Sequence, residues 1–462
     1  MIVAINNSYL RRVCVKPLLD GITEAPGALP LLGHTLSLLR DPLAFLESLP
    51  AEADLVQIRF GPLRAVVVRD VELSRQVLRE DQIFDKGGPL FEQIREVLGY
   101  GLGTCPYSEH RRQRRLTQPA FHRSRFSGYT QVMTAQAAAM TSDWRDGEIL
   151  DVLPEMMTLT IRTVAETMFS GALPSDRFET VIEDLSVIVG GIYRRALMPP
   201  VLNQLLTPAN RRYHQARIRL RRTLGDIIME RRADANDRCD LLSALLAART
   251  DDAQGMTDTE ISDQVITFFA AGSETTAVLL SWVLYLLALH PEIEERVHAE
   301  ATLVLENSPA AKFEHLPDLR LTGHVITETL RMYPPLWMLT RTATVDTQLG
   351  RYALPAGTTM VYSPYLIHHR SDLYVDRDRF DPDRWESAQL PRGAFIPFGA
   401  GARRCIGDQF GIAEAVLTLA TITARWRLMS VPGQRVRPVA ASTLKPRGLK
   451  LRAIMRGKST HG

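Results

Sequence analysis

The sequence predicts a mainly helical protein with a smaller β-rich part. Apolar residues three and four positions apart, the period of an amphipathic helix, dominate residues 72–300. Short alternating segments bounded by turn residues occur around residues 50–70 and 342–369. No Gly/Ser-rich linker or internal repeat interrupts the 462 residues, so we expect a single domain over residues 1–462.

Composition narrows the class of protein. With 45% hydrophobic and 23% charged residues, the chain has the composition of a globular protein. A net charge of +3 is too small to indicate a nucleic-acid partner, although it permits a local basic face. The four cysteines show no paired spacing, which favours a reducing cytoplasm. The apolar run 277–289 is shorter than the ~20 residues that span a bilayer, so we expect no membrane anchor.

The elements can be justified in chain order. The lead-in EAPGALPLLGH is broken by proline and glycine and should be irregular. LVQIRF and RAVVVRD, around residues 55–70, alternate and should form a hairpin. A long helix should begin near Thr257, and a strand-rich patch interrupted by Gly350 and Pro355 should follow it. A further helix should begin after Gly407.

One cysteine lies in an unusual turn, FGAGARRCIG, residues 398–407. A thiolate is a nucleophile and a soft metal ligand, and nearby cations or a helix N-terminus lower a thiol pKa. Arg403 and Arg404 precede Cys405, and a helix-like segment follows it. Glycines 399, 401 and 407 would let backbone N–H groups turn toward the sulfur. The alternative is an inert, buried cysteine in a glycine turn.

This turn matches F-G-x-G-x-R-x-C-x-G and resembles the haem-binding loop of the cytochrome P450 superfamily. The resemblance implies haem b held between a long distal helix and a proximal loop that carries the cysteine. It implies that Cys405 is the axial iron ligand, that Arg403 faces a haem propionate and that Phe398 packs beside the sulfur. A cysteinate ligand pushes electron density onto the iron and favours O–O cleavage.

A second motif supports the resemblance. In VITETLRMYPP, Glu328 and Arg331 are three apart on one helix face and can pair. The pair could be a surface salt bridge worth well under ~1 kcal/mol. In the family, the corresponding pair is joined by an arginine from a later loop, and Arg384 in FDPDRW occupies that position. Asp383 and Trp385 replace the usual Glu and Phe. The resemblance implies a structural triad for folding and haem retention.

A third motif, AAGSETTA at residues 270–277, lies on the long helix. Ala271 and Gly272 are small enough for a planar cofactor and a diatomic gas to approach. An unpaired carboxylate such as Glu274 is costly in an apolar helix, and a mid-helix Thr usually bonds back to a carbonyl one turn earlier. The stretch resembles the family's A-G-x-[DE]-T segment. The resemblance implies that Thr275 hydrogen-bonds dioxygen and that Glu274 helps to relay protons.

A fourth motif is the basic segment EHRRQRRLTQPAFH, which alone could be a solvated helix face or an anion patch. His110 and Arg114 are four apart and share a face. The resemblance places both at the haem propionates, together with Arg341. Arg112 and Arg115 should instead face outward near the proximal surface.

The resemblance implies a monooxygenase that uses O2 and two electrons per turnover. GYGLG at 99–103 is a weak dinucleotide signal because no strand precedes it, so electrons from NAD(P)H should arrive through a ferredoxin reductase and a ferredoxin. An acidic ferredoxin could dock on a basic proximal face near Arg112, Arg115 and Arg404. A peroxide-driven variant is the alternative within the family, and it should lack the acid–alcohol pair.

The substrate should be a hydrophobic small molecule, with a sesquiterpene as the leading candidate. Two successive oxidations at one carbon would give an alcohol and then a ketone; another lipid or a polyketide is the alternative. Residues 187–206 should form a lid. Core packing explains any single pocket residue equally well. The expected pocket contacts are Phe91, Leu98, Phe268, Trp337 and Leu339.

An acidic stretch, residues 249–263, raises a different possibility. Clustered carboxylates can hold Mg²⁺ against a diphosphate, which would give a terpene synthase activity on farnesyl diphosphate. The spacing departs from D-D-x-x-D because Gly255 occupies the fifth position, and Thr257 with Glu260 also fits a helix capping box. The candidate ligands are Asp251, Asp252, Asp258 and Glu260.

Overall fold

The fold is described from a computed structural model of the chain. The structure describes residues 19–457, apart from residues 20, 62, 88, 171–174, 198–206, 235–237, 239, 251–252 and 307. The chain divides into two compact units, and each is assembled from separate stretches of sequence. Unit 1 comprises residues 1–88, 337–377 and 390–404, and unit 2 comprises residues 89–336, 378–389 and 405–462. The single domain expected from the sequence stays a prediction.

Unit 1 is built on a six-stranded mixed sheet in the order β1-β2-β3-β9-β6-β4. The predicted hairpin is present: Leu55 pairs with Val68 and Phe60 pairs with Leu63 in antiparallel register. Its valines and isoleucine are buried, which suits β-branched residues on a pleated surface. The strands are β1 (Thr23–Glu24), β2 (Leu55–Phe60), β3 (Leu63–Val68), β4 (Phe84–Asp85), β6 (Leu339–Ala343) and β9 (Thr359–Tyr362).

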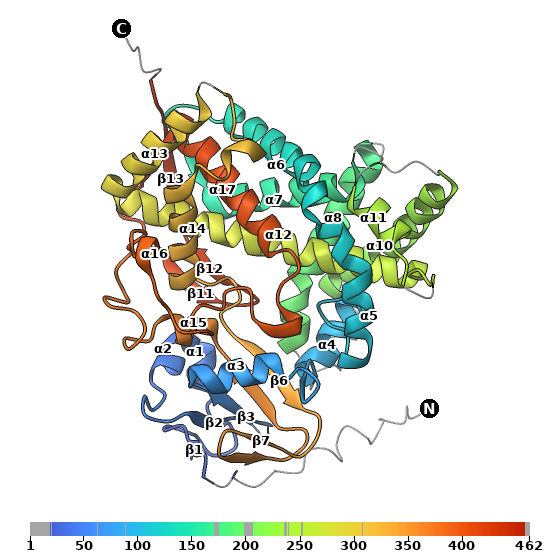
Figure 1. Ribbon diagram of the computed structural model, residues 1–462, viewed down its shortest axis with the longest axis vertical. Helices are drawn as coiled ribbons and strands as arrows, with labels where there is room; N and C mark the ends of the chain where they lie inside the picture. Colours follow the sequence, from blue (N-terminus) through green and yellow to red (C-terminus); the bar gives the residue numbers. More distant parts are fainter. Residues whose placement is uncertain are drawn as a thin grey trace. The chain divides into compact units, whose positions relative to one another are not determined.

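Short helices and a second hairpin complete unit 1 (Figure 1). The second hairpin pairs β7 with β8 around Gly350, as the turn signal predicted. The helices are α1 (Thr35–Arg40), α2 (Pro42–Glu47), α3 (Val71–Arg79), α15 (Pro364–His368) and the 3₁₀ turn η4 (Gly401–Arg403), and the strands are β7 (Thr347–Leu349) and β8 (Tyr352–Leu354).

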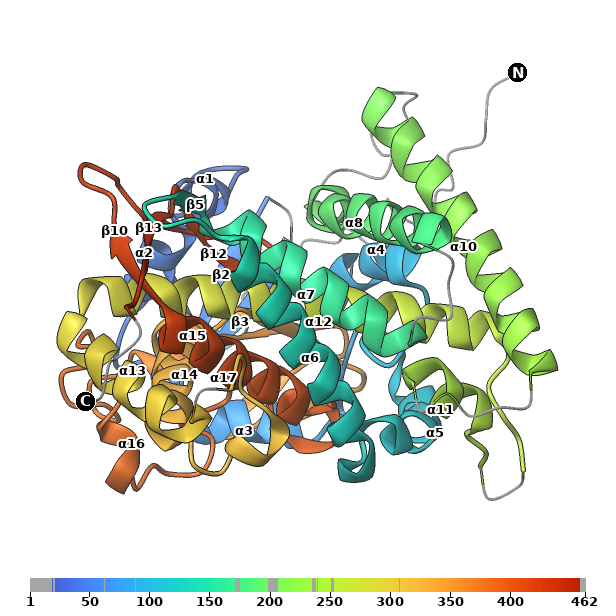
Figure 2. The ribbon, with the colours of Figure 1, turned by 90° about the horizontal axis from the view of Figure 1, so that it is seen from above.

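Unit 2 is mainly helical, in agreement with the periodicity of the sequence. Figure 2 shows α6, α7, α12 and α17 as neighbouring helices. α12 packs on α7 and α17, and α6 packs on the same two helices. The helices are α4 (Pro89–Leu98), α5 (Tyr107–Thr117), η2 (Gln118–Phe121), α6 (Arg123–Asp143), α7 (Val152–Phe169), α8 (Ser175–Leu197), α10 (Pro208–Ala233), α11 (Leu241–Ala247), α12 (Asp258–Leu289), α13 (Pro291–Leu305), η3 (Phe313–His315), α14 (Arg320–Met332), α16 (Arg384–Ser387) and α17 (Asp408–Arg425).

Unit 2 also contains strands that the sequence patterns did not predict. One sheet has the order β10-β13-β5, and a separate hairpin pairs β11 with β12. These strands are only 3 to 6 residues long, too short for a clear periodic signal in the sequence. They are β5 (Ile149–Asp151), β10 (Trp426–Ser430), β11 (Arg437–Ala440), β12 (Leu444–Arg447) and β13 (Lys450–Met455).

The helix α12 is the central element of unit 2. Thr257 is its N-cap and forms a reciprocal capping box with Glu260, as the sequence predicted. By length and composition α12 could cross a membrane, but 67% of its most apolar window is buried inside the structure. Its Trp282 ring stacks on Tyr333 at 3.8 Å, and the indole N–H donates to the Leu444 carbonyl. These contacts indicate a core helix.

A fully buried ion pair stands at the end of α14. Arg331 donates to both carboxylate oxygens of Glu328, at 2.9 and 2.8 Å, and both side chains have no exposed surface. Arg384 approaches Glu328 at 3.5 Å from α16. The Trp385 indole N–H also donates to Glu328 at 2.9 Å, a bond that the family's usual phenylalanine cannot make. The structure therefore brings the three members of the expected triad together.

Removing the shared carboxylate should destabilise the fold. We expect Glu328→Gln to lower the free energy of unfolding by about 3–5 kcal/mol because it leaves buried arginines without their counter-charge. Trp385→Phe should cost less, about 1.5–3 kcal/mol, the value of one hydrogen bond to a charged group. Urea denaturation monitored by circular dichroism measures both changes.

The matched control is Asp383→Asn. Asp383 pairs with Arg296 at 2.7 Å, but both side chains are about half exposed, so the change should cost less than about 1 kcal/mol. If Glu328→Gln proves no more costly than Asp383→Asn, the triad has no special structural importance.

Candidate functional site

The thiol of Cys405 lies between a glycine turn and a helix. Cys405 is exposed, whereas Cys105 is buried. Cys405 follows the 3₁₀ turn η4 by two residues and precedes the N-cap of α17, Gly407, by two residues. A helix N-terminus carries a partial positive charge that favours a thiolate. The position therefore suits a thiolate that binds a metal, and the alternative of an inert, buried cysteine does not fit its exposure.

The turn before the cysteine requires glycine. Gly399 and Gly401 both have φ of +69°, a conformation that residues with a Cβ rarely adopt. A Cβ at Gly401 would lie 2.3 Å from the carbonyl oxygen of Leu78, at the end of α3. This contact fixes the turn against α3 within unit 1. Phe398, at the start of the turn, is half-buried.

Arg403 is buried and has carboxylate partners within unit 1. Its Nε lies 3.1 Å from Asp81, and its Nη2 lies 2.7 Å from Asp85. The expected propionate contact of Arg403 stays a prediction, and the guanidinium is already paired with these two aspartates. The next residue, Arg404, is exposed.

The middle of α12 is open where the rest of the helix is buried. Ala271 is exposed, and Gly272 and Thr275 are half-buried, although the turns before and after them are buried. The opening is lined by small side chains, as a planar cofactor would require. Gly272 has a packing role as well, since a Cβ there would lie 2.9 Å from Val164 of α7.

Thr275 and Glu274 have defined partners. The Thr275 hydroxyl donates to the carbonyl of Ala271 at 2.6 Å, the bond that a mid-helix threonine usually makes. Glu274 is buried and accepts hydrogen bonds from Ser442 and Thr443, each at 2.9 Å.

An ammonium group completes the surroundings of Glu274. Lys445 Nζ lies 2.6 Å from the same carboxylate, and its side chain is 35% exposed. The β11–β12 hairpin thus supplies all of these partners of Glu274 and connects the buried carboxylate toward solvent. The sequence alone does not predict these partners of Glu274, because no spacing relates residue 274 to residues 442–445.

Cationic and donor groups assigned to the propionates occur in both units. In unit 2, His110 of α5 is buried, and Arg114 is half-buried with its Nε 3.1 Å from Gln118. In unit 1, Arg341 of β6 is 2% exposed and lies over the Tyr362 ring at 5.6 Å. The buried Nε of Arg341 has no hydrogen-bond partner among the described residues. An unpartnered guanidinium N–H fits an anion such as a haem carboxylate.

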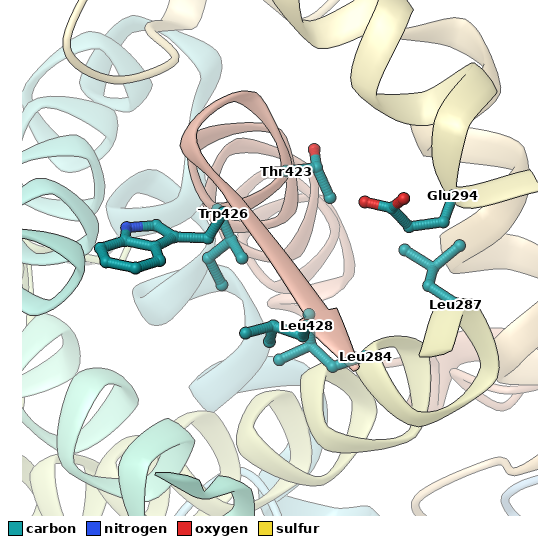
Figure 3. Close-up of a pocket in the computed structure, with 7 residues that line it drawn as sticks. Leu284, Leu287, Glu294, Thr423, Trp426 and Leu428 are labelled. Carbon is teal, nitrogen blue, oxygen red and sulfur yellow. The ribbon is translucent and has the colours of Figure 1, made fainter. Parts of the chain in front are cut away.

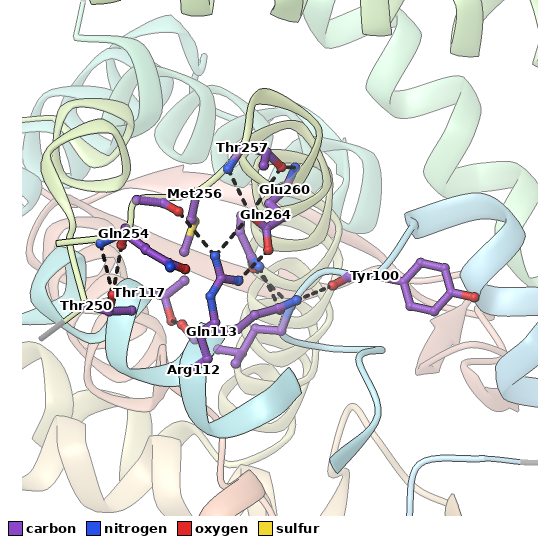
Figure 4. Close-up of polar contacts among 12 residues, drawn as sticks. Tyr100, Arg112, Gln113, Thr117, Thr250, Gln254, Met256, Thr257, Glu260 and Gln264 are labelled. Atoms are coloured by element: carbon purple, nitrogen blue, oxygen red, sulfur yellow. Dashed lines mark hydrogen bonds and ion pairs between the residues drawn. The ribbon is translucent and has the colours of Figure 1, made fainter. Parts of the chain in front are cut away.

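The structure corrects the expected position of Arg112. Arg112 does not face outward, because its guanidinium binds Glu260 at 2.5 Å and its side chain is only 31% exposed (Figure 4). The hydrogen bond that Arg112 donates to Glu260 raises the pKa of Arg112. Burial raises the pKa of Glu260, but hydrogen bonds from Arg112 and Thr257 outweigh it and lower that pKa overall. Arg115 is exposed, as expected.

The same contacts leave the magnesium hypothesis without support. Glu260 is engaged by Arg112 and the capping box, and Asp258 pairs with Arg232 at 2.8 Å. The described residues contain no group of three or more His, Cys, Asp or Glu that could hold a metal ion. Asp251 and Asp252 lie outside the described residues.

The expected apolar contacts are largely buried. Phe268 of α12 belongs to a buried hydrophobic cluster of unit 2 and packs edge-on against Phe121, with ring centroids 5.2 Å apart. Leu98 packs against the same cluster. Phe91 lies on α4 in unit 2, whereas Trp337 and Leu339 belong to unit 1. Of the expected lid, residues 198–206 lie outside the described residues.

A small hollow in unit 2 lies apart from these residues (Figure 3). None of the candidate site residues lines it, so it is not a candidate substrate site. Its lining is Leu284, Leu287, Glu294, Ile422, Thr423, Trp426 and Leu428.

Glu414 is a buried acid that the sequence motifs do not predict. Glu414 of α17 is 1% exposed, and its carboxyl oxygens have no well-formed hydrogen bond. Burial raises the pKa of Glu414 to about 8, although nearby hydroxyls of Thr276 and Thr163 favour its charged form slightly. Thr276 follows Thr275 on α12, so α17 and the candidate site meet at this carboxyl. The only signal in the sequence is an acidic residue among apolar residues in the middle of α17.

An exposed cysteine in a glycine turn and an acid–alcohol pair on a buried helix define a candidate haem-thiolate protein. The family model Cytochrome P450 matches residues 24–452. The chain therefore belongs to the cytochrome P450 family and is a monooxygenase. Membership implies haem iron, dioxygen and reducing electrons.

Individual relatives agree with the family. A pentalenene oxygenase of Streptomyces avermitilis is 46% identical over 436 residues, covering 94% of this chain and 97% of the relative. A cyclooctat-9-en-7-ol 5-monooxygenase of Streptomyces melanosporofaciens is 46% identical and covers 88% and 90%. The crystal structure of the cytochrome P450DA heme domain superposes with a TM-score of 0.85 at 26% identity, covering 96% of this chain and 99% of that one.

The raised pKa of Glu414 predicts a loss of stability with rising pH. The neutral form is favoured in the fold, so the stabilisation is complete below the unfolded pKa of 4.5 and is lost as pH approaches 8. Glu414→Gln stays neutral, so the wild type should lose stability relative to this variant between pH 5 and 8, by on the order of a few kcal/mol. Melting temperatures of both proteins at pH 5.5, 7 and 8.5 measure the difference.

The exposed Glu52 provides a control, because Glu52→Gln should follow the wild-type pH profile. Parallel profiles for wild type and Glu414→Gln would show that Glu414 does not titrate in this range.

Proposed function

We propose that this protein is a haem-thiolate monooxygenase that oxidises a terpenoid. The observation that carries the proposal is the exposed thiol of Cys405, set between a glycine turn and the N-terminus of α17. That helix packs on α12, which has its opening at Ala271. The thiol thus lies just before α17, the opening lies on α12, and these two helices pack together in unit 2.

The donor set suits haem b. Cys405 would supply the axial thiolate, and Phe398 would pack beside it. His110, Arg114 and Arg341 would bind the two propionates, with Arg341 supported by its unpartnered Nε. Arg403 would assist them only alongside its aspartates. The bound haem would supply the activation of dioxygen that the oxidation of a C–H bond requires.

Two residues of α12 would handle protons. The Thr275 hydroxyl donates to Ala271 and can accept a further hydrogen bond at its oxygen. The Glu274 carboxylate is held by the half-exposed Lys445, so a proton can reach the buried carboxylate from solvent through this side chain and its hydration. We propose that Thr275 orients the oxygen substrate and that Glu274 relays protons to it.

Electrons would come from NAD(P)H through a ferredoxin reductase and a ferredoxin. The exposed Arg115 and Arg404 suit an acidic protein, and an interaction of this kind should weaken with ionic strength. Arg112 is withdrawn from this role because it binds Glu260. The low cysteine content fits the cytoplasm proposed for the enzyme.

The substrate class rests on the relatives and on apolar residues. Pentalenene and cyclooctat-9-en-7-ol appear in the names of the relatives at 46% identity. Phe91 and Phe268 are buried apolar side chains in unit 2, which suits a hydrophobic substrate. As the finer proposal, epi-isozizaene would be oxidised to albaflavenols and then to albaflavenone at one carbon. Product analysis with several terpenes and a surrogate ferredoxin pair would identify the substrate.

Ligand substitution tests the thiolate. Cys405→His should keep haem bound through a nitrogen ligand, but its ferrous carbonyl complex should lose the strongly red-shifted Soret band of sulfur ligation. The control Cys105→Ala should keep that band, because Cys105 is buried and lies outside the glycine turn. A red-shifted band in Cys405→His would refute the assignment.

Thr275→Val tests the proton role. Valine preserves the shape of the side chain but removes the hydroxyl, so NADPH and O2 consumption should continue. Product per O2 should fall by about 10²-fold, the lower end of the ~10²–10⁴ range for positioned proton transfer. Product and O2 measured with epi-isozizaene and a surrogate ferredoxin pair give the ratio. Ser273→Ala, which removes a buried back-bonded hydroxyl from the same helix, should keep wild-type coupling. Unchanged coupling in Thr275→Val would defeat the assignment.

A further inference from the structure

Two sequence features that the proposed function leaves unused meet in unit 2. One is the glycine loop, defined here as residues 99–103 (GYGLG), and the other is the acidic start of α12. The glycine loop follows α4 and lies against α12 at Asp263, Gln264 and Thr267.

The glycine loop is held by hydrogen bonds from its backbone. The N–H of Tyr100 donates to Asp263 Oδ2 at 2.9 Å, and the N–H of Leu102 donates to the side-chain oxygen of Gln264 at 2.9 Å. Gln264 in turn donates to Gln113, which donates to the Tyr100 carbonyl at 2.8 Å (Figure 4). The loop is therefore tied to α12 directly and through α5.

Glycine is needed because the loop approaches α12 very closely. A Cβ at Gly99 would lie 2.2 Å from the Asp263 carboxyl carbon. A Cβ at Gly101 would lie 2.1 Å from the Thr267 hydroxyl and 2.7 Å from the Asp263 carbonyl oxygen. Side chains at these positions would push the loop away, so glycine here serves close packing.

Asp263 joins this loop to a third element. Arg221 of α10 lies 3.0 Å from Asp263 Oδ1, while Oδ2 accepts from Tyr100. The Asp263 side chain is only 8% exposed, and that of Arg221 is 35% exposed. One buried carboxylate thus serves two partners, and a second arginine of α10, Arg217, donates to the Glu96 carbonyl of α4. Removing one partner of a buried charge is costly because the remaining charge is left uncompensated.

The glycine loop carries part of an apolar wall. Leu102 belongs to the same buried cluster as Phe268, and Leu98 packs against it. The position of this wall therefore depends on the bonds to Asp263 and Gln264.

We propose that Asp263 is a positioning residue that fixes the glycine loop against α12 and, through Arg221, latches α10 to that loop. The carboxylate sets the shape of the apolar wall that a hydrophobic ligand meets, and the ion pair must yield when α10 and the loop separate. The role of the wall in substrate recognition rests on the proposed function, whereas the latch itself does not.

Hydrogen exchange on the holoenzyme tests the latch without any turnover. Asp263→Ala should speed exchange of the Tyr100 and Leu102 amides by about tenfold or more, the factor for loss of one charge-assisted hydrogen bond. Arg221→Gln keeps the bond from Tyr100, so its loop amides should change by less than about threefold. The control Asp258→Asn, which alters another arginine-paired carboxylate of α12, should leave these amides unchanged.

Ligand access gives the second measurement. Binding of 4-phenylimidazole, followed by the Soret shift in a stopped-flow instrument, should be several-fold faster in Asp263→Ala and in Arg221→Gln than in wild type and Asp258→Asn. Wild-type product formation by variants with faster exchange and faster access would support the latch and count only against the role of the wall in substrate recognition, which rests on the proposed function.

Two results would overturn the latch. One is unchanged exchange at Tyr100 and Leu102 in Asp263→Ala. The other is an unchanged access rate in both Asp263→Ala and Arg221→Gln.

Discussion

Burial of α12 is the constraint on which the rest of unit 2 depends. Of its 32 residues 22 are buried, and several of these carry polar side chains that cannot reach bulk water. A buried charge is costly unless it is paired and hydrogen-bonded. Three of the four carboxylates of α12 are at least partly buried, and each of these therefore binds a distant segment: Glu260 binds α5, Asp263 binds the glycine loop and α10, and Glu274 binds the β11–β12 hairpin.

This pairing organises the chemistry as well as the fold. The acid proposed to relay protons, Glu274, is also the residue that anchors a C-terminal hairpin. The open part of α12 at Ala271 is only one turn from it. A carboxylate that is both structural and reactive is held in one orientation, which favours directed proton transfer. The same α12 packs on α17, the helix that follows Cys405, near Glu414.

The turn before Cys405 is likewise held in place by paired charges. Arg403 pairs with both Asp81 and Asp85, and Gly401 packs on the carbonyl of Leu78, so the turn is held by contacts within unit 1 before the chain enters α17. Cys405 itself remains exposed. The contacts fix the backbone and leave the sulfur accessible, which is the requirement for a metal ligand.

The sequence by itself determined what depends on neighbours along the chain. The hairpin at residues 55–68, the capping box at Thr257, the helix after Gly407 and the cysteine turn all follow from local periodicity and residue type. Only the tertiary structure decided which distant groups meet. It pairs Lys445 with Glu274 and Arg112 with Glu260, and it packs the glycine loop on Asp263. These pairs form because a buried charge needs a partner when it leaves water, and the partners are far apart in the sequence. No local pattern therefore encodes which partner a buried charge will find.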